Sequence, residues 1–147
     1  LVYNSGGYDD ISALRLLEGI IDIYMPDLKF SDPGFAAECC SAADYFEVTK
    51  DALKEMFRQK GLLQMDNQGI AYRGLMIRHL VMPSGLAGTI KIMEFLASEI
   101  SPDTYINVMD QYRPSGDIPP KISRPISLYE YRQAVEIAAS KGLHNFL

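Results

Sequence analysis

Short apolar runs alternate with one-sided helical patterns along the chain. Runs rich in β-branched and aromatic residues predict buried strands at 1–4, 20–30, 74–83 and 104–112. Apolar residues repeated at helical spacing predict helices at about 11–18, 47–60, 89–99 and 128–141. This alternation predicts a parallel sheet built from βα units, and therefore an α/β fold.

Local signals mark the ends of several elements. Asp32 followed by proline is a typical helix start. Ser127 and Glu130 have the spacing of a capping box for the last helix. Residues 62–72 predict a small hairpin around Asp-Asn-Gln-Gly, and residues 143–147 a final short strand.

The number and character of the strands restrict the architecture. Strands that are apolar almost throughout predict that both faces of the sheet are covered. Four or five strands are too few to close an eight-stranded barrel. A doubly wound sheet stays possible, although neither GxGxxG nor GxxxxGK[ST] follows a strand.

The chain is acidic and has no long apolar segment. Its 147 residues suit one domain and carry a formal net charge of -5, with Lys and Arg scattered singly. Nucleic acid binding needs clustered basic residues, so nucleic acid is not an expected partner. No apolar run approaches the roughly 20 residues that span a bilayer, so no membrane is expected either. Leu1 opens directly into a strand pattern, which indicates that the chain begins inside a longer protein.

The two cysteines, Cys39 and Cys40, are neighbours in a run of small residues. Adjacent cysteines rarely form a disulfide with each other, because that geometry is strained. Two cysteines also cannot hold a four-iron cluster. The favoured interpretation is the end of a helix. Low cysteine content without a disulfide framework is typical of a cytoplasmic protein.

Polar side chains gather where the strands end. They are Asn4 on the first strand, Asp27 and Lys29 on the second, Arg78 and His79 on the third, and Gln111, Tyr112 and Arg113 after the fourth. Sites of parallel α/β proteins form at the carboxyl ends of strands, so we expect these groups to converge. Alternation places Asp27 and Lys29 on one face of their strand, and Arg78 and His79 on opposite faces of theirs.

Structural interpretations compete with a binding site. Asp27 and Lys29 are also expected as a simple ion pair, and Arg78 as the partner of Asp22 or Asp110. A single histidine on an apolar strand is more often structural than a ligand.

Four segments together resemble radical S-adenosylmethionine (SAM) proteins of the pyruvate formate-lyase activating type. They are YNSGG at 3–7, DIYMPDLKF at 22–30, IRHLVMPSGLAGT at 77–89 and SPDTYINVMDQYRP at 101–114. The similarity covers essentially the whole chain, from about residue 2 to residue 142. Within this family, the chain most resembles the branch of activating-enzyme-related proteins.

The resemblance implies that residues 1–147 form the C-terminal portion of a partial (β/α) barrel of the TIM type, truncated at its N-terminus. In such proteins a CxxxCxxC loop holds a [4Fe-4S] cluster whose open iron chelates SAM. Reductive cleavage of SAM gives a 5′-deoxyadenosyl radical, which abstracts a hydrogen. Activating enzymes take it from a glycine of a partner glycyl-radical enzyme, so the implied partner is such an enzyme or another protein substrate.

The resemblance also implies roles for residues on the first two strands. Asn4 matches the asparagine of the family's TNG turn, near the SAM site. Asp27 and Lys29 match its DLK motif. The lysine is expected to contact the SAM carboxylate, and the aspartate to lie near that carboxylate or a cation.

Later strands supply the remaining expected SAM-binding residues. Arg78 matches the arginine of the IRxxVxPG strand, beside the adenosyl group, and Gln111 and Tyr112 match the polar end of the last barrel strand. The chain departs from the family because CxxxCxxC and the GGE-like turn are absent, and Tyr3 stands where the family has threonine. A full-length parent is therefore expected to bind SAM and the cluster, whereas this chain alone is expected to bind neither and to be inactive.

Two other interpretations stay open. The chain is alternatively a non-catalytic α/β binding or scaffold domain, or a metal-independent lyase with Lys29 as a Schiff-base amine. A truncated barrel would expose the edge of its first strand, which predicts a homo-oligomer.

Overall fold

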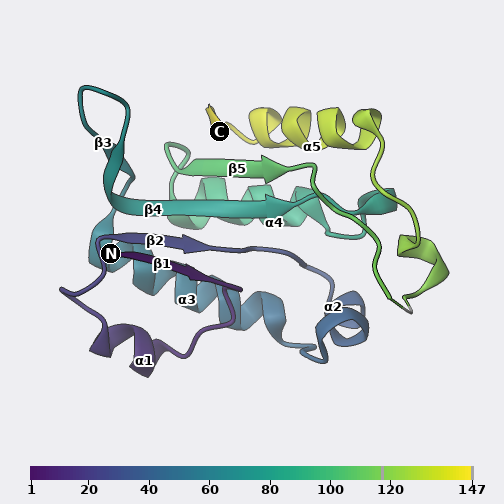
Figure 1. Ribbon diagram of the computed structural model, residues 1–147, viewed down its shortest axis with the longest axis horizontal. Coiled ribbons are helices and arrows are strands. Elements are labelled where there is room, and N and C mark those ends of the chain that lie inside the picture. Colours follow the sequence, from purple (N-terminus) through teal and green to yellow (C-terminus); the bar gives the residue numbers. More distant parts are fainter. Residues whose placement is uncertain (117, 147) are drawn as a thin grey trace.

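A parallel sheet forms the centre of the computed structural model, which describes residues 1–116 and 118–146 (Figure 1). The strands are β1 (Val2–Ser5), β2 (Ile23–Pro26), β3 (Gln64–Met65), β4 (Ala71–Leu80), β5 (Tyr105–Met109) and β6 (Asn145–Phe146). Five of them are parallel in the order β1-β2-β4-β5-β6, and β3 pairs antiparallel with β4. The final strand is confirmed by β6, although Leu147 lies outside the described residues.

Helices alternate with the strands, which confirms the α/β fold. They are α1 (Ile11–Leu16), α2 (Pro33–Cys40), α3 (Tyr45–Lys60), α4 (Thr89–Phe95) and α5 (Leu128–Ser140). A π-helical turn, Leu96–Ile100, continues α4, and 3-10 turns occupy Pro83–Gly85 and Pro120–Ile122. Within the described parts of the chain, no helix is both long and apolar enough to cross a bilayer.

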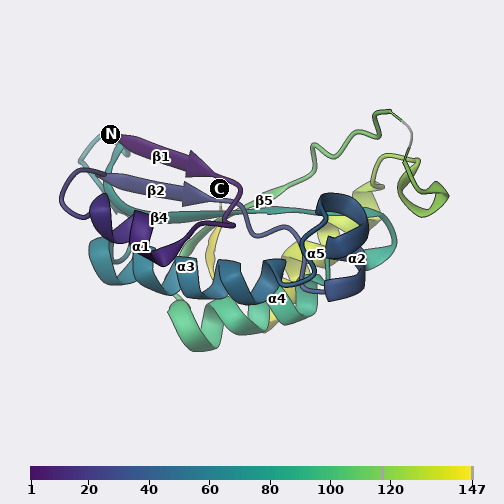
Figure 2. The same cartoon turned by 90° about the horizontal axis from the view of Figure 1, so that it is seen from below.

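The helices gather on one face of the sheet (Figure 2). On this face Tyr24, Ile77 and Ile106 are fully buried in the main core, which also takes residues from α3 and α4. The alternate residues of the same strands, such as Met25 and Met76, are only half-buried. We call their side the open face of the sheet.

The expectation that both faces are covered is therefore wrong for the described residues. The open-face positions of β2 and β4 include isoleucine and methionine, so each strand reads as a continuous apolar run although only one face is packed under helices. Composition does not distinguish an apolar side chain under a helix from one on the open face.

The local signals are confirmed. The carboxylate of Asp32 accepts the Phe35 N–H at 2.7 Å and caps α2, and Ser127 and Glu130 form the capping box of α5. Cys39 and Cys40 end α2 as exposed free thiols. The strand expected at 20–30 is shorter in the structure. After Pro26 the segment keeps only an isolated bridge from Asp27 to Arg78, and the Lys29 N–H donates to the Tyr45 hydroxyl.

A second, smaller core lies beyond the carboxyl ends of the strands. Its buried members are Phe30, Phe35, Ala36, Tyr45, Met82, Ala87 and Ile122. It packs α2 and the segment around Ile122 against the loops that follow β2 and β4. These loops are therefore held by apolar contacts on the helical side, next to the polar strand ends.

Gly74 in β4 lies close against the backbone of Leu62 and Leu63. Its φ is 122°, and a Cβ there would lie 2.3 Å from the Leu62 carbonyl oxygen and 2.5 Å from the Leu63 Cα. We expect Gly74→Ala to lower the free energy of unfolding by about 3 kcal/mol or more, measured by urea denaturation, because backbone must move. The control Gly69→Ala, at φ 78° with no atom within 4 Å, should cost only about 1 kcal/mol of backbone strain. Equal losses for the two variants would contradict this packing.

Candidate functional site

The parallel register aligns polar residues of three strands on the open face. Asp27 bridges to Arg78, and Arg78 pairs with Asn107. One step toward the amino ends of the strands, the row is less polar, since Met76 pairs with Tyr105. The polar row thus lies at the carboxyl ends of the strands, where parallel α/β proteins place their sites.

Four of the six expected site residues meet in this region and form what we call the strand-end cluster: Asn4, Asp27, Lys29 and Arg78. The Arg78 Nε donates to Asp27 Oδ1 at 2.8 Å, and its Nη2 lies 2.6 Å from the same oxygen. That Nη2 also donates to Asn4 Oδ1 at 2.8 Å. The Lys29 Nζ lies 3.2 Å from Asp27 Oδ2. One carboxylate therefore joins the ends of β2 and β4 and holds both cations.

The cluster carries more positive than negative charge. Asp27 is its only carboxylate and is the least exposed member, with 11% of its side chain accessible against 23% for Arg78 and 36% for Lys29. Two cations against one anion leave a formal charge of one positive unit. In the described parts of the chain the Arg78 Nη1 donates to no residue. Cations at a half-buried site favour an anionic group of a ligand, such as a carboxylate, because attraction is screened less there than in water.

The backbone of residues 27–29 is held from several sides. The Leu28 N–H donates to the Arg78 carbonyl at 2.8 Å. The Lys29 N–H donates to the Tyr45 hydroxyl at 3.1 Å, and that hydroxyl donates to the Gly6 carbonyl at 2.8 Å. Burial raises the pKa of Tyr45 to about 12, so it keeps the proton that it donates. The sequence did not indicate Tyr45, because its position in α3 looks like an ordinary apolar helix residue.

The other two expected residues border the site without joining the cluster. Gln111 and Tyr112 line a cavity of about 530 Å³ together with three cluster members. However, the Gln111 amide donates to the Met109 sulfur at 3.2 Å, and the Tyr112 hydroxyl to the Ile122 carbonyl at 2.8 Å. A neighbouring cavity of about 450 Å³ shares Arg78 and lies over Asn107.

The structure decides between the alternatives for the charged residues. Asp27 and Lys29 form the expected ion pair, so the structural interpretation of these two residues is confirmed. The expectation that Arg78 pairs with Asp22 or Asp110 is wrong, since its carboxylate partner is Asp27. The bridge between the ends of β2 and β4 brings these two side chains together, which depends on strand pairing.

His79 points to the opposite face from Arg78, as the alternation predicts, and is fully buried. Its Nδ1 lies 2.8 Å from the Leu28 carbonyl oxygen and its Nε2 lies 2.9 Å from the Thr89 hydroxyl. Burial lowers its pKa to about 4, so the ring is neutral at physiological pH.

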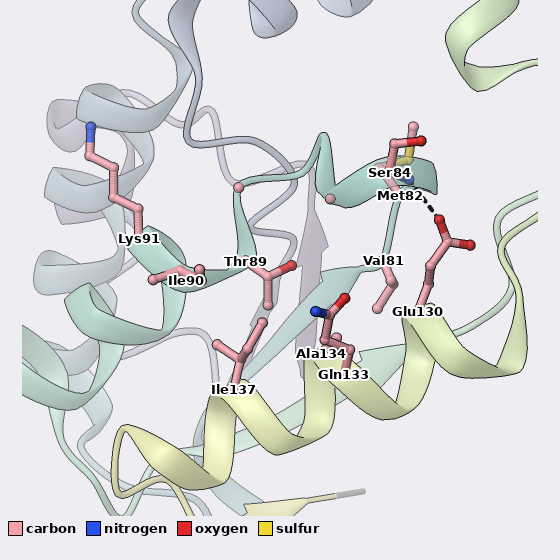
Figure 3. A pocket seen from close by; sticks show the side chains of 12 residues that line it. Val81, Met82, Ser84, Thr89, Ile90, Lys91, Glu130, Gln133, Ala134 and Ile137 are labelled. Carbon is pink, nitrogen blue, oxygen red and sulfur yellow. Dashed lines mark hydrogen bonds between the residues drawn. The ribbon is translucent and has the colours of Figure 1, made fainter.

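A separate cavity of about 450 Å³ lies between the start of α4 and α5 (Figure 3). Val81 and Ile137 form apolar walls. Glu130 pairs with Arg124 at 2.7 Å and also accepts the Ser84 N–H at 2.7 Å. The Lys91 ammonium lies 5.2 Å from the centre of the Phe46 ring. The sequence did not predict this cavity, because it depends on how two helices pack.

A metal site is not formed by the described residues. Within 1–116 and 118–146, His, Cys, Asp and Glu side chains form no group of three or more that could hold a metal ion.

Comparison with known proteins finds a relative that aligns with nearly the whole chain. The chain is 32% identical over 146 residues to the uncharacterized protein MJ0674 of Methanocaldococcus jannaschii. The alignment covers 97% of this chain but only 39% of that protein. No family model matches the chain, and no solved structure matches it. The chain thus spans well under half the length of this relative.

His79 should give the stability a dependence on pH. In the unfolded chain its pKa returns to about 6.5, whereas in the folded chain it is about 4. The unfolded state binds more protons between these values, so the free energy of unfolding falls as the pH is lowered through this range, by up to about 1.4 kcal/mol per pH unit. Urea denaturation at several pH values should show a flatter profile for His79→Asn. The other histidine, His144, is present in both proteins and cannot cause a difference between them. Identical profiles would therefore contradict a lowered pKa of His79.

Proposed function

We propose that this chain is the C-terminal part of a radical SAM protein of the pyruvate formate-lyase activating type, and that its strand-end cluster binds SAM. The observation that carries the proposal is the charge of the cluster, in which Asp27 alone balances Lys29 and Arg78. A ligand carboxylate would supply the missing negative charge, and SAM has one. The cluster favours a carboxylate in general, and the resemblance of the sequence specifies SAM.

The proposed roles follow the positions of the side chains. Lys29, the more exposed of the two cations of the cluster, donates to the SAM carboxylate. Arg78 lies beside the adenosyl group, and Asp27 and Asn4 hold its guanidinium in one orientation. If a [4Fe-4S] cluster were bound beside SAM, it would supply the electron that cleaves SAM to methionine and a 5′-deoxyadenosyl radical for hydrogen abstraction.

We also propose that the complete protein is a partial (β/α) barrel. The helices cover one face of the sheet, as in the outer layer of a barrel (Figure 2). The strand-end cluster lies on the open face, which would be the lumen. The greater length of MJ0674 supports a parent with further strands beside these five.

The cysteines of a [4Fe-4S] cluster would have to lie outside these residues. The chain has only two, and both are exposed at the end of α2. A cytoplasmic location and a glycine of a partner protein as substrate belong to the same proposal. The missing CxxxCxxC favours one alternative, an α/β domain that binds a carboxylate ligand without catalysis.

Reconstitution of the full-length protein tests this proposal. After anaerobic loading with iron and sulfide and addition of a reductant, we expect 5′-deoxyadenosine from SAM, measured by chromatography. Lys29→Met should raise the KM for SAM about tenfold or more, because a hydrogen bond between charged groups is lost. The control Lys141→Met has similar exposure, 33% against 36%, but its ammonium pairs with Glu94 away from the cluster.

The outcomes separate the candidates. A loaded cluster without SAM cleavage would contradict the radical SAM assignment. A full-length protein that lacks three cysteines at CxxxCxxC spacing, yet binds a carboxylate ligand through Lys29, would support the non-catalytic alternative. Equal KM values for the two lysine variants would contradict the role of Lys29.

A further inference from the structure

His79 is a buried titratable group that the proposed function does not use. It lies on β4, directly after Arg78, but on the helical face of the sheet. Its two ring nitrogens contact two different segments, the carbonyl of Leu28 and the hydroxyl of Thr89. Leu28 stands between Asp27 and Lys29, so one ring contact reaches the segment that carries two members of the cluster.

The contacts fix the tautomer of the ring. A carbonyl oxygen only accepts, so Nδ1 must carry the proton and donate to Leu28. The ring is neutral, and Nε2 therefore accepts the hydroxyl hydrogen of Thr89. No titratable side chain contacts either ring nitrogen in the part of the chain described. The neutral ring therefore bridges the loop after β2 and the start of α4 through two hydrogen bonds.

Leu28 is held at both of its backbone polar groups. Its N–H donates to the Arg78 carbonyl at 2.8 Å, and its carbonyl accepts from His79 at 2.8 Å. Its side chain is fully buried in the main core. Since side chains alternate along an extended segment, this anchoring aims Asp27 and Lys29 at the open face.

The segment around Thr89, which the ring contacts through Nε2, is anchored as well. Thr89 begins α4, and the preceding Gly88 carbonyl accepts from the Ser31 hydroxyl at 3.0 Å. The Ser31 N–H donates to the Ala87 carbonyl at 3.0 Å. The segment after β2 is therefore tied twice to the loop before α4.

We propose that His79 is a positioning residue of the strand-end cluster, which sets the directions of Asp27 and Lys29 through the Leu28 carbonyl. The inference rests on the proposed function only for the identity of the ligand. An apolar residue of similar size would leave both the Leu28 carbonyl and the Thr89 hydroxyl without partners in a dry environment. Asparagine keeps an N–H donor close to the position of Nδ1.

Nuclear magnetic resonance of the 147-residue chain tests this without any ligand. The wild-type ring should show the nitrogen shifts of the Nδ1-protonated tautomer, and the Arg78 Nε–H should be protected from exchange by its bond to Asp27. In His79→Leu the Arg78 Nε–H should exchange about tenfold faster or more, while His79→Asn should restore most of the protection.

Controls separate positioning from a general loss of stability. Leu53→Ala removes a fully buried core side chain of α3 and serves as a variant with a loss of overall stability similar to that of His79→Leu. It should nevertheless leave the Arg78 Nε–H protected from exchange. Thr89→Val preserves the shape of Thr89 but removes its hydroxyl, and the Arg78 Nε–H should exchange at an intermediate rate in it. This variant keeps the test decisive if His79→Leu fails to fold. Wild-type protection in both His79→Leu and Thr89→Val, or equal loss in Leu53→Ala, would overturn the proposal.

The full-length protein gives the second measurement. His79→Leu should weaken SAM binding by about tenfold, and His79→Asn by less than about threefold, measured by calorimetry. If the wild type does not bind SAM, the proposed function fails, whereas the exchange measurement still decides the role of His79. Equal SAM affinities for wild type and His79→Leu would overturn the role of His79 alone.

Discussion

The carboxylate of Asp27 is the group on which the arrangement of the strand ends depends. It accepts two contacts from the Arg78 guanidinium and one from the Lys29 ammonium, and so ties the end of β2 to β4. Without it, two cations would face each other at one edge of the sheet. Removing one partner of a fully buried ion pair costs about 3–5 kcal/mol, and the partial exposure here reduces that cost. The same carboxylate orders the side chains of the cluster. Because it is the only anion beside two cations, the cluster favours an additional anionic group from a ligand.

The two faces of the sheet have different tasks. The helical face is packed and buried, and His79 on it is neutral with both ring nitrogens hydrogen-bonded. The open face holds the charged side chains over cavities. The alternation of side chains along a strand makes this possible, since neighbours in sequence, Arg78 and His79, serve opposite faces. The position of the charged groups is thus fixed from beneath by the packed core.

The sequence allowed the prediction of much of the fold, because helical spacing, caps and strand ends are local signals. The capping box at Ser127 and the convergence of Asn4, Asp27 and Arg78 follow from such signals and from the geometry of parallel sheets. The uncovered face did not follow, since methionine suits a packed face and an open one alike. The role of Tyr45 did not follow either, because a hydroxyl on an amphipathic helix gives no sign of the loops that it will meet.

A double-mutant cycle on Asp27 and Arg78 is the most direct test of the cluster as one interacting unit. Asp27→Asn, Arg78→Met and the double variant would be compared with the wild type by urea denaturation. We expect the two substitutions to be coupled by about 1 kcal/mol or more, in the range found for residues in direct contact. Additive losses, within about 0.3 kcal/mol, would show that the two side chains act independently and would contradict the dependence of the strand ends on this ion pair.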